Sequence, residues 1–222
     1  VYFRLDMSHA LLDGTSMSVL ISDLTFAYGN QLSAPTAIPY SDYIAYIQSQ
    51  PPVDGLKFWT DHLADVKPCH FPSLLVSSEV EPQMKAINVI IPDHLEVRAF
   101  CQENNVTLAN VIRLAWSLVL AAYTGEEHVC FGYLTAGREI PLPGVESAVG
   151  PFINMLVCAI NPGQISQKSV VVELQDLHDE YVKMLPYQHV GLAEIQHALG
   201  VTGQALFNTV VSFQRRDVGM LV

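Results

Sequence analysis

The sequence predicts a layered α/β fold. Segments with the apolar period of a helix alternate along the chain with short apolar runs that are typical of strands. The chain has 222 residues, of which 50% are hydrophobic and 15% are charged, so it can fill a sizeable core. This composition excludes a disordered chain, and the alternation argues against a helix bundle or a β-sandwich.

The first part of the chain is predicted to contain one strand and three helices. Residues 1–7 suit a buried strand because they are mostly apolar and large. Helices are expected after this strand over residues 17–28, 40–50 and 54–63. The first of them ends at Gly29, the second ends before Pro51, and Asp54 is the candidate cap of the third.

The remaining chain is predicted to contain four strands and four helices. The strands are expected at 86–91, 129–134, 153–160 and 206–213, and the helices at 93–103, 107–123, 173–185 and 192–199. The helix over 107–123 is apolar almost all round, which predicts that it is buried. Residues 66–83 contain prolines and serines without a clear period, so we expect a linker there.

The charge balance restricts the partners of the chain. Eleven basic and 22 acidic residues give a net charge of −11, which disfavours binding to nucleic acid and to an anionic membrane. The longest apolar stretch, between Arg113 and Glu126, is interrupted by polar residues and is too short to span a bilayer. The first residues lack an initiator Met and are predicted to lie inside a strand. We therefore expect the chain to be an excerpt from a longer polypeptide.

The cysteine pattern predicts reduced thiols packed in a core. Four cysteines lie far apart in the sequence and form no CxxC or Cys/His cluster; they are Cys69, Cys101, Cys130 and Cys158. This spacing supports neither a zinc site nor a disulfide scaffold, so no metal is expected. Reduced thiols are typical of an intracellular protein, and the predicted location is cytoplasmic.

One short motif carries residues suited to catalysis. Ser8-His9-Ala10-Leu11-Leu12-Asp13-Gly14 lies between a predicted strand and a predicted helix, where α/β folds commonly place functional groups. A histidine can act as a base near neutral pH, and an aspartate at this position can cap the helix. The pattern alone leaves two readings open: a catalytic histidine, or a hydrogen-bonded histidine beside a capping aspartate. The chain contains no HExxH, GxSxG or phosphate-loop motif.

The motif and several later blocks resemble one family. Residues 7–16 resemble the active-site motif of condensation domains from nonribosomal peptide synthetases. Further similar blocks follow in the order of that family, at 58–63, 106–125, 129–133, 137–138, 149–154 and 206–209. The family usually has two adjacent histidines, and here the first of them is Ser8. The pattern of Ser8, His9, Asp13 and Ser16 is similar to that of fungal terminal condensation-like domains, which release peptides by cyclisation.

The resemblance implies a two-lobed fold like that of chloramphenicol acetyltransferase, present here as a fragment. Each lobe would consist of a sheet flanked by helices, with the active site in a tunnel between the lobes. Residues 1–65 would form the end of the N-terminal lobe and carry the motif. Residues 66–83 would link the lobes, and residues 84–222 would form an incomplete C-terminal lobe.

The resemblance also implies an activity, a type of substrate and partners. The expected reaction is attack of an amine on a carrier-bound peptidyl thioester, which forms an amide and can cyclise and release the peptide. The substrates would be held on the phosphopantetheine arms of carrier domains, and no cofactor would bind to the chain directly. Peptidyl carrier domains and adjacent synthetase modules are the expected partners. Two alternatives share the fold: a coenzyme A-dependent acyltransferase, and a non-catalytic domain that recruits partners.

His9 and Asp13 receive different roles from this resemblance. His9 is the expected catalytic residue, and it would accept the proton of the amine or hold the amine in line. Asp13 is expected to be structural, because the family precedent is an ion pair with an arginine that shapes the site. Arg4 is the nearest arginine in the sequence, and the alternative is an arginine that lies outside these 222 residues.

Three further residues are candidates for the site. Gly14 is expected where a side chain would obstruct the tunnel or the turn. Ser8 and Asn154 are candidates to line the substrate tunnel. Each also has a simpler reading: Ser8 as a serine at a helix edge without a function, and Asn154 as a polar residue at the start of a strand.

Overall fold

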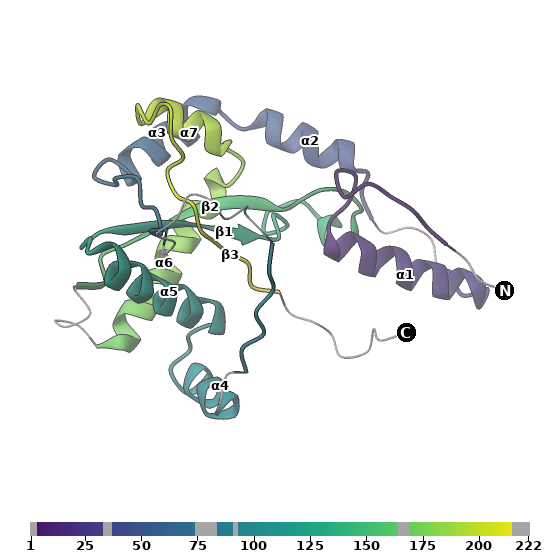
Figure 1. Ribbon diagram of the computed structural model, residues 1–222. Helices are drawn as coiled ribbons and strands as arrows, with labels where there is room; N and C mark the ends of the chain where they lie inside the picture. Colours follow the sequence, from purple (N-terminus) through teal and green to yellow (C-terminus); the bar gives the residue numbers. More distant parts are fainter. Residues whose placement is uncertain (1–3, 33–36, 74–83, 91–92, 164–168, 215–222) are drawn as a thin grey trace. The chain divides into compact units, whose positions relative to one another are not determined.

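The computed structural model describes residues 4–32, 37–73, 84–90, 93–163 and 169–214 (Figure 1). The helices are α1 (Gly14–Tyr28), α2 (Tyr40–Ser49), α3 (Pro52–His62), α4 (His94–Glu103), α5 (Leu108–Thr124), α6 (Val170–Met184) and α7 (Leu192–Ala198). Two short 3-10 helices are η1 (Val145–Ser147) and η3 (Leu185–Tyr187). The strands are β1 (Val129–Thr135), β2 (Asn154–Ile160) and β3 (Val210–Val211), and they form a sheet in the order β2-β1-β3.

The chain divides into two compact units. The first contains Val1–Ala64, Tyr133–Leu156 and Met184–Gly200, and the second contains Asp65–Gly132, Val157–Lys183 and Val201–Val222. The predicted lobes at 1–65 and 84–222 group the residues differently, by their expected place in a complete two-lobed fold, and that assignment stays a prediction. Residues 74–83 of the predicted linker lie outside the described residues.

The core of the first unit forms around aromatic side chains of α2, α3 and the segment before β2. Tyr43 and Phe152 are buried, with ring centroids 4.6 Å apart in an edge-to-face arrangement. In α3, Trp59 is fully buried, and its Nε1 donates to the backbone oxygen of Tyr187 at 2.9 Å. Figure 1 shows α3 beside α7, with which it packs.

The start of α3 differs from the prediction. Pro51 occupies the N-cap position and Pro52 the first helical position, so Asp54 lies in the first turn and is not the cap. A proline fits at the first position because a helix leaves that N–H without a partner in any case. The predicted cap was therefore wrong, although the helix itself is confirmed.

In the second unit, α5 is capped at both ends but is less buried than expected. The Thr107 hydroxyl accepts from the Asn110 N–H at 3.1 Å, and Gly125 ends the helix with φ +74°. Leu114 and Leu120 are buried, but one face of α5 is exposed and contains Leu118, Val119 and Tyr123. The prediction of a helix buried on all sides was wrong, because apolar composition does not determine how many neighbours surround a helix.

Three predicted strands are absent or shortened in the described residues. Residues 4–7 and 86–90 have no strand structure, and the strand expected over 206–213 is reduced to Val210–Val211. A strand forms only where a neighbouring strand accepts and donates its backbone hydrogen bonds. The apolar side chains of Ile87 and Ile90 are accordingly exposed. Residues 1–3 and 91 of the predicted strands lie outside the described residues.

All four cysteines are free and buried. Burial is the largest cause that raises the pKa of Cys130, and likewise of Cys158, in each case to about 12. Such thiols stay protonated near neutral pH and therefore serve as packing groups rather than nucleophiles.

Candidate active site

The aspartate of the sequence motif begins helix α1. Asp13 has an extended backbone and is the N-cap, and its Oδ1 accepts from the N–H of Ser16 at 2.7 Å. A carboxylate at this place satisfies a free N–H group and interacts favourably with the helix dipole. The cap is the reason that α1 begins at Gly14, before the start at residue 17 that the apolar period alone predicts.

Asp13 forms a buried ion pair with Arg138. Nη2 of Arg138 lies 3.1 Å from Oδ1 and 3.4 Å from Oδ2 of Asp13, and both side chains are buried. The backbone N–H of Phe152 donates to Oδ2 at 3.2 Å. Arg4, the nearest arginine in the sequence, instead pairs with Asp6 at 2.8 Å on the exposed surface, so it is not the partner of Asp13.

Arg138 is held in place by backbone groups and by an aromatic ring. Its Nη1 donates to the carbonyl oxygens of Val145 and Ala148, each at 2.7 Å, and its guanidinium lies 4.0 Å from the centroid of the Phe152 ring. Gly137, just before it, has φ +68°, and a Cβ there would come within 1.8 Å of the Phe152 carbonyl oxygen. Glycine is therefore required where the chain delivers the arginine to Asp13.

Hydrogen bonds and charge keep Asp13 ionised. Burial alone would raise the pKa of Asp13, but the hydrogen bond from the Ser16 N–H, the charge of Arg138 and the N–H of Phe152 together outweigh burial. The net effect is a pKa below the ordinary value of an aspartate. A carboxylate with this pKa and these partners is poorly suited to exchange protons near neutral pH.

His9 lies in a different environment from Asp13. It belongs to a short turn before α1, and its side chain is exposed. Ser8 shapes this turn, since its Oγ accepts from the Ala10 N–H at 3.3 Å and its carbonyl oxygen accepts from the Leu11 N–H at 3.0 Å. The imidazole of His9 is thus presented at the surface of the first unit, at the N-terminal end of α1.

Gly14 follows Asp13 as the first residue of α1, and Asn154 is the first residue of β2. A Cβ on Gly14 would have no atom of the described residues within 4 Å, so neither the turn nor local packing explains the glycine. Asn154 is half-buried at the start of β2, in the first unit. Burial raises the pKa of Tyr43, and the neighbouring Asn154 side chain acts in the opposite direction.

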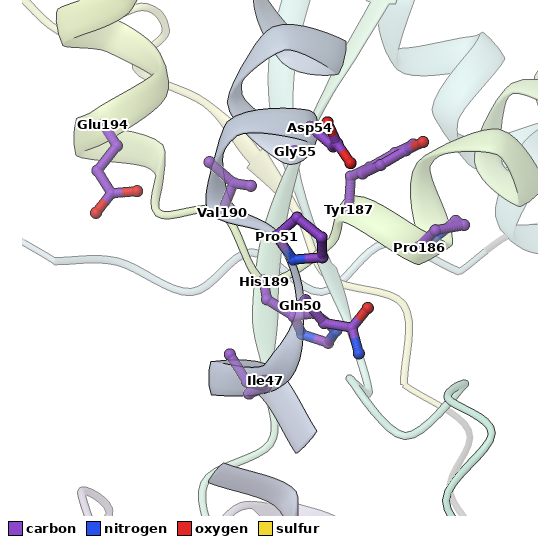
Figure 2. Close-up of a pocket in the computed structure, with 10 residues that line it drawn as sticks. All are labelled: Ile47, Gln50, Pro51, Asp54, Gly55, Pro186, Tyr187, His189, Val190 and Glu194. Atoms are coloured by element: carbon purple, nitrogen blue, oxygen red, sulfur yellow. The ribbon is translucent and has the colours of Figure 1, made fainter. Parts of the chain in front are cut away.

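A separate pocket of about 380 Å³ lies in the first unit (Figure 2). Its walls come from α2, α3, η3 and α7, and the lining residues are Ile47, Gln50, Pro51, Asp54, Gly55, Pro186, Tyr187, His189, Val190 and Glu194. Burial lowers the pKa of His189, which keeps this imidazole neutral at physiological pH. The predicted site residues do not line this pocket.

Among the described residues, His, Cys, Asp and Glu side chains do not gather in groups of three or more that could hold a metal ion. No single described helix is long and apolar enough to cross a membrane. The pair Leu95–Glu103 and Leu108–Thr124 meets that criterion only jointly, and it is bent by 108°.

The buried ion pair of Asp13 and Arg138 joins the SHxxxDG motif to the later block that contains Gly137 and Arg138. The chain belongs to the condensation domain family, which matches residues 1–218. It is 42% identical to nonribosomal peptide synthetase atnA of Emericella nidulans over 217 residues, which are 97% of this chain and 3% of that protein. It is 43% identical to nonribosomal peptide synthetase 5 of Gibberella zeae over 219 residues, which are 98% of this chain and 2% of that protein.

Solved structures show the same fold. The crystal structure of CT matches 96% of this chain and 46% of its own, with a TM-score of 0.66 and 22% identity. The first condensation domain of the calcium-dependent antibiotic synthetase matches 92% of this chain and 48% of its own, with a TM-score of 0.64 and 18% identity. The chain therefore has the chloramphenicol acetyltransferase-like fold of condensation domains and spans about half the length of these solved domains.

Sequence reasoning missed Arg138 as the partner of Asp13. Gly137 and Arg138 lie in a block that resembles the family, but the pattern does not show which acidic residue the arginine meets. The glycine directly before the arginine was the available signal, since glycine often marks a close approach of two backbone segments.

Proposed function

We propose that this chain supplies the catalytic motif of a domain that forms an amide by attack of an amine on a carrier-bound acyl thioester. The observation that carries this proposal is the division of roles in the motif. Asp13 is buried and saturated by contacts with Arg138, Ser16 and Phe152, whereas His9 is exposed. His9 is thus the group of the pair that is placed to meet a substrate.

In the proposed reaction, the amine nitrogen attacks the thioester carbonyl carbon. The C–N bond forms, the C–S bond breaks, and the proton that leaves the nitrogen ends on the departing thiol sulfur. An α-amino group has a pKa of about 7.7–8.0, so the enzyme must present it unprotonated. His9 contacts this amine, and the backbone N–H of Gly14, at the first position of α1, is the candidate donor to the oxyanion.

Carrier domains would deliver the thioester substrate on phosphopantetheine arms. The similarity to two fungal synthetases supports this, since 97% and 98% of the chain align with them. The partners proposed for this chain are accordingly peptidyl carrier domains and neighbouring synthetase modules. A requirement for a carrier-bound thioester would distinguish this domain from an acyltransferase that uses free coenzyme A thioesters.

We further propose that the domain cyclises and releases its peptide. The support is the pattern Ser8, His9, Asp13 and Ser16, which resembles that of fungal terminal condensation-like domains. In this case the attacking amine belongs to the same peptide as the thioester, so the product is a ring and no second carrier is loaded.

The test uses a complete condensation domain that contains these residues, with its natural carrier domain. Peptidyl thioester is supplied on the carrier and, in parallel, as the free coenzyme A thioester, and products are identified by mass spectrometry. We expect an amide product from the carrier-bound substrate at a rate well above that from the free thioester. Equal rates would favour the coenzyme A-dependent alternative, and no product from either substrate would favour a non-catalytic domain. Cyclic product supports release by cyclisation, and a linear product on a second carrier contradicts it.

Replacing Gly14 by alanine tests whether this glycine faces substrate. Alanine is the better helix former and its Cβ meets no atom of the described residues within 4 Å, so the melting temperature is expected to be unchanged or slightly higher. Product formation is expected to fall at least tenfold, because the methyl group occupies space beside the substrate. The neighbouring exposed substitution Thr15→Ala is the control. A lowered melting temperature in Gly14→Ala would show instead that the glycine serves the turn.

A further inference from the structure

We propose that the Ser16 hydroxyl is a positioning residue that fastens the start of α1 to the Gly150–Phe152 segment and thereby sets the geometry around His9. This inference rests on the proposed function. Ser16 is a helix residue without an assigned role, and it does not lie on the surface that the motif histidine occupies. Its action would pass through Gly150 and Arg138 rather than through contact with substrate.

The Ser16 side chain uses its full hydrogen-bonding capacity. It is 0% exposed, and its Oγ donates to the carbonyl oxygen of Gly150 at 2.8 Å. The same Oγ accepts from the Gly150 N–H and from Nη2 of Arg138, each at 3.0 Å. A hydroxyl has one donor and two acceptor sites, and all three are occupied here. Replacing Ser16 by alanine would leave all three partner groups without this hydroxyl.

Tyr40 of α2 also contacts the Gly150–Phe152 segment to which Ser16 is hydrogen-bonded. The Tyr40 hydroxyl, at the start of α2, donates to the carbonyl oxygen of Pro151 at 3.1 Å. A Cβ on Gly150 would come within 2.1 Å of the Tyr40 ring, so ring and backbone are in close contact. Asp13 adds a hydrogen bond from its N–H to the Gly150 carbonyl oxygen at 3.3 Å. The starts of α1 and α2 therefore fix the same short stretch of backbone.

In the sequence, the two segments that Ser16 joins, the start of α1 and residues 150–152, each lie beside one candidate substrate-facing residue of the first unit. His9 precedes Asp13 by about one helical turn of sequence, and Asn154 follows Phe152 at the start of β2. A shift of α1 relative to residues 150–152 would move the His9 turn relative to Asn154. Because misplacement of a reacting group by about 1 Å can cost on the order of 10²-fold in rate, loss of the hydroxyl should reduce catalysis without removing a catalytic group.

The experiment compares Ser16→Ala and Ser16→Cys with Ser18→Ala in the complete domain. Ser18 is the matched control, because its exposed hydroxyl donates only within α1, to the Gly14 carbonyl oxygen at 3.3 Å. Each variant is assayed well below its own melting temperature, with rates expressed per folded molecule. We expect kcat to fall about 10²-fold in both Ser16 variants with KM for the carrier-bound thioester unchanged, and Ser18→Ala to match the wild type. Ser16→Cys keeps a side-chain atom in place of the hydroxyl oxygen but hydrogen-bonds only weakly, so it tests the proposal even if Ser16→Ala folds poorly.

A second measurement does not depend on activity. Amide hydrogen exchange at Gly150 and Phe152 is expected to be faster in the Ser16 variants than in Ser18→Ala, because the segment loses its fastening. Unchanged exchange, or wild-type kcat in a folded Ser16 variant, overturns the positioning role. An inactive wild-type domain with accelerated exchange in the Ser16 variants would instead count against the proposed function while leaving the fastening by Ser16 supported.

Discussion

Replacing His9 by alanine in the complete domain is expected to lower the rate of product formation by about 10²–10⁴-fold, the usual contribution of a general acid or base. The imidazole is exposed and is not part of the buried network around Asp13, so its removal should change the melting temperature little. Loading of the carrier should be unaffected, since His9 would act at the bond being formed and not at a docking surface.

The measurement is single-turnover product formation with preloaded carrier, followed by mass spectrometry. His197→Ala, which removes another exposed imidazole of the first unit from α7, is the control. Wild-type turnover in His9→Ala would contradict the assignment of His9. A His9→Gln variant separates the two roles considered for His9, because glutamine can still hold the amine by a hydrogen bond but cannot take its proton. If His9 only orients the amine, His9→Gln keeps much of the rate, and if His9 takes the proton, His9→Gln is as slow as His9→Ala.

Replacing Asp13 by asparagine is expected to destabilise the domain by about 3–5 kcal/mol, the usual effect of breaking a buried ion pair. The asparagine can still accept from the Ser16 N–H, but the positive charge of Arg138 is then buried without a counter-charge. Such a loss is a large part of the folding free energy of an ordinary domain. The control is Asp6→Asn, which removes a carboxylate that pairs with Arg4 on the exposed surface.

The effect of Asp13→Asn should depend on pH. The pKa of Asp13 is lower in the folded protein than in the unfolded chain, so the carboxylate stabilises the fold fully above its unfolded pKa of about 3.9. This stabilisation is lost as the pH falls through the folded pKa. Thermal melts from neutral pH into the acidic range should therefore show the difference between wild type and variant shrinking on acidification. An unchanged melting temperature at neutral pH together with a changed pH–rate profile would show that Asp13 acts on protons instead.

Helix positions were largely predictable because their signals are local. Thr107 and Gly125 bound α5 through groups within a few residues of each helix end, and the Asp13 cap is equally local. The family was also predictable, since blocks of residues in a fixed order carry it and residues 1–218 match.

Interactions between distant segments were not predictable in the same way. Arg138 is separated from Asp13 by 125 positions, and the nearer Arg4 is the better guess from sequence alone. The apolar runs at 4–7 and 86–90 have the composition of strands, but a strand depends on its neighbour, which a local pattern does not identify. The exposed face of α5 was unpredictable for the same reason, because the burial of a helix depends on the segments that surround it and not on its own composition.

The long separation between Asp13 and its partners has a consequence for synthesis of the protein. Phe152, which completes the hydrogen bonds of the carboxylate, follows Asp13 by 139 positions. At about 5–20 residues per second, the ribosome needs roughly 7–28 s to reach it after adding Asp13. During that interval α1 has its cap but lacks the cation and the backbone N–H that fix its position. The motif can therefore reach its working geometry only after Phe152 has been added, and codon usage between the two blocks would influence how long the nascent motif is open to chaperones.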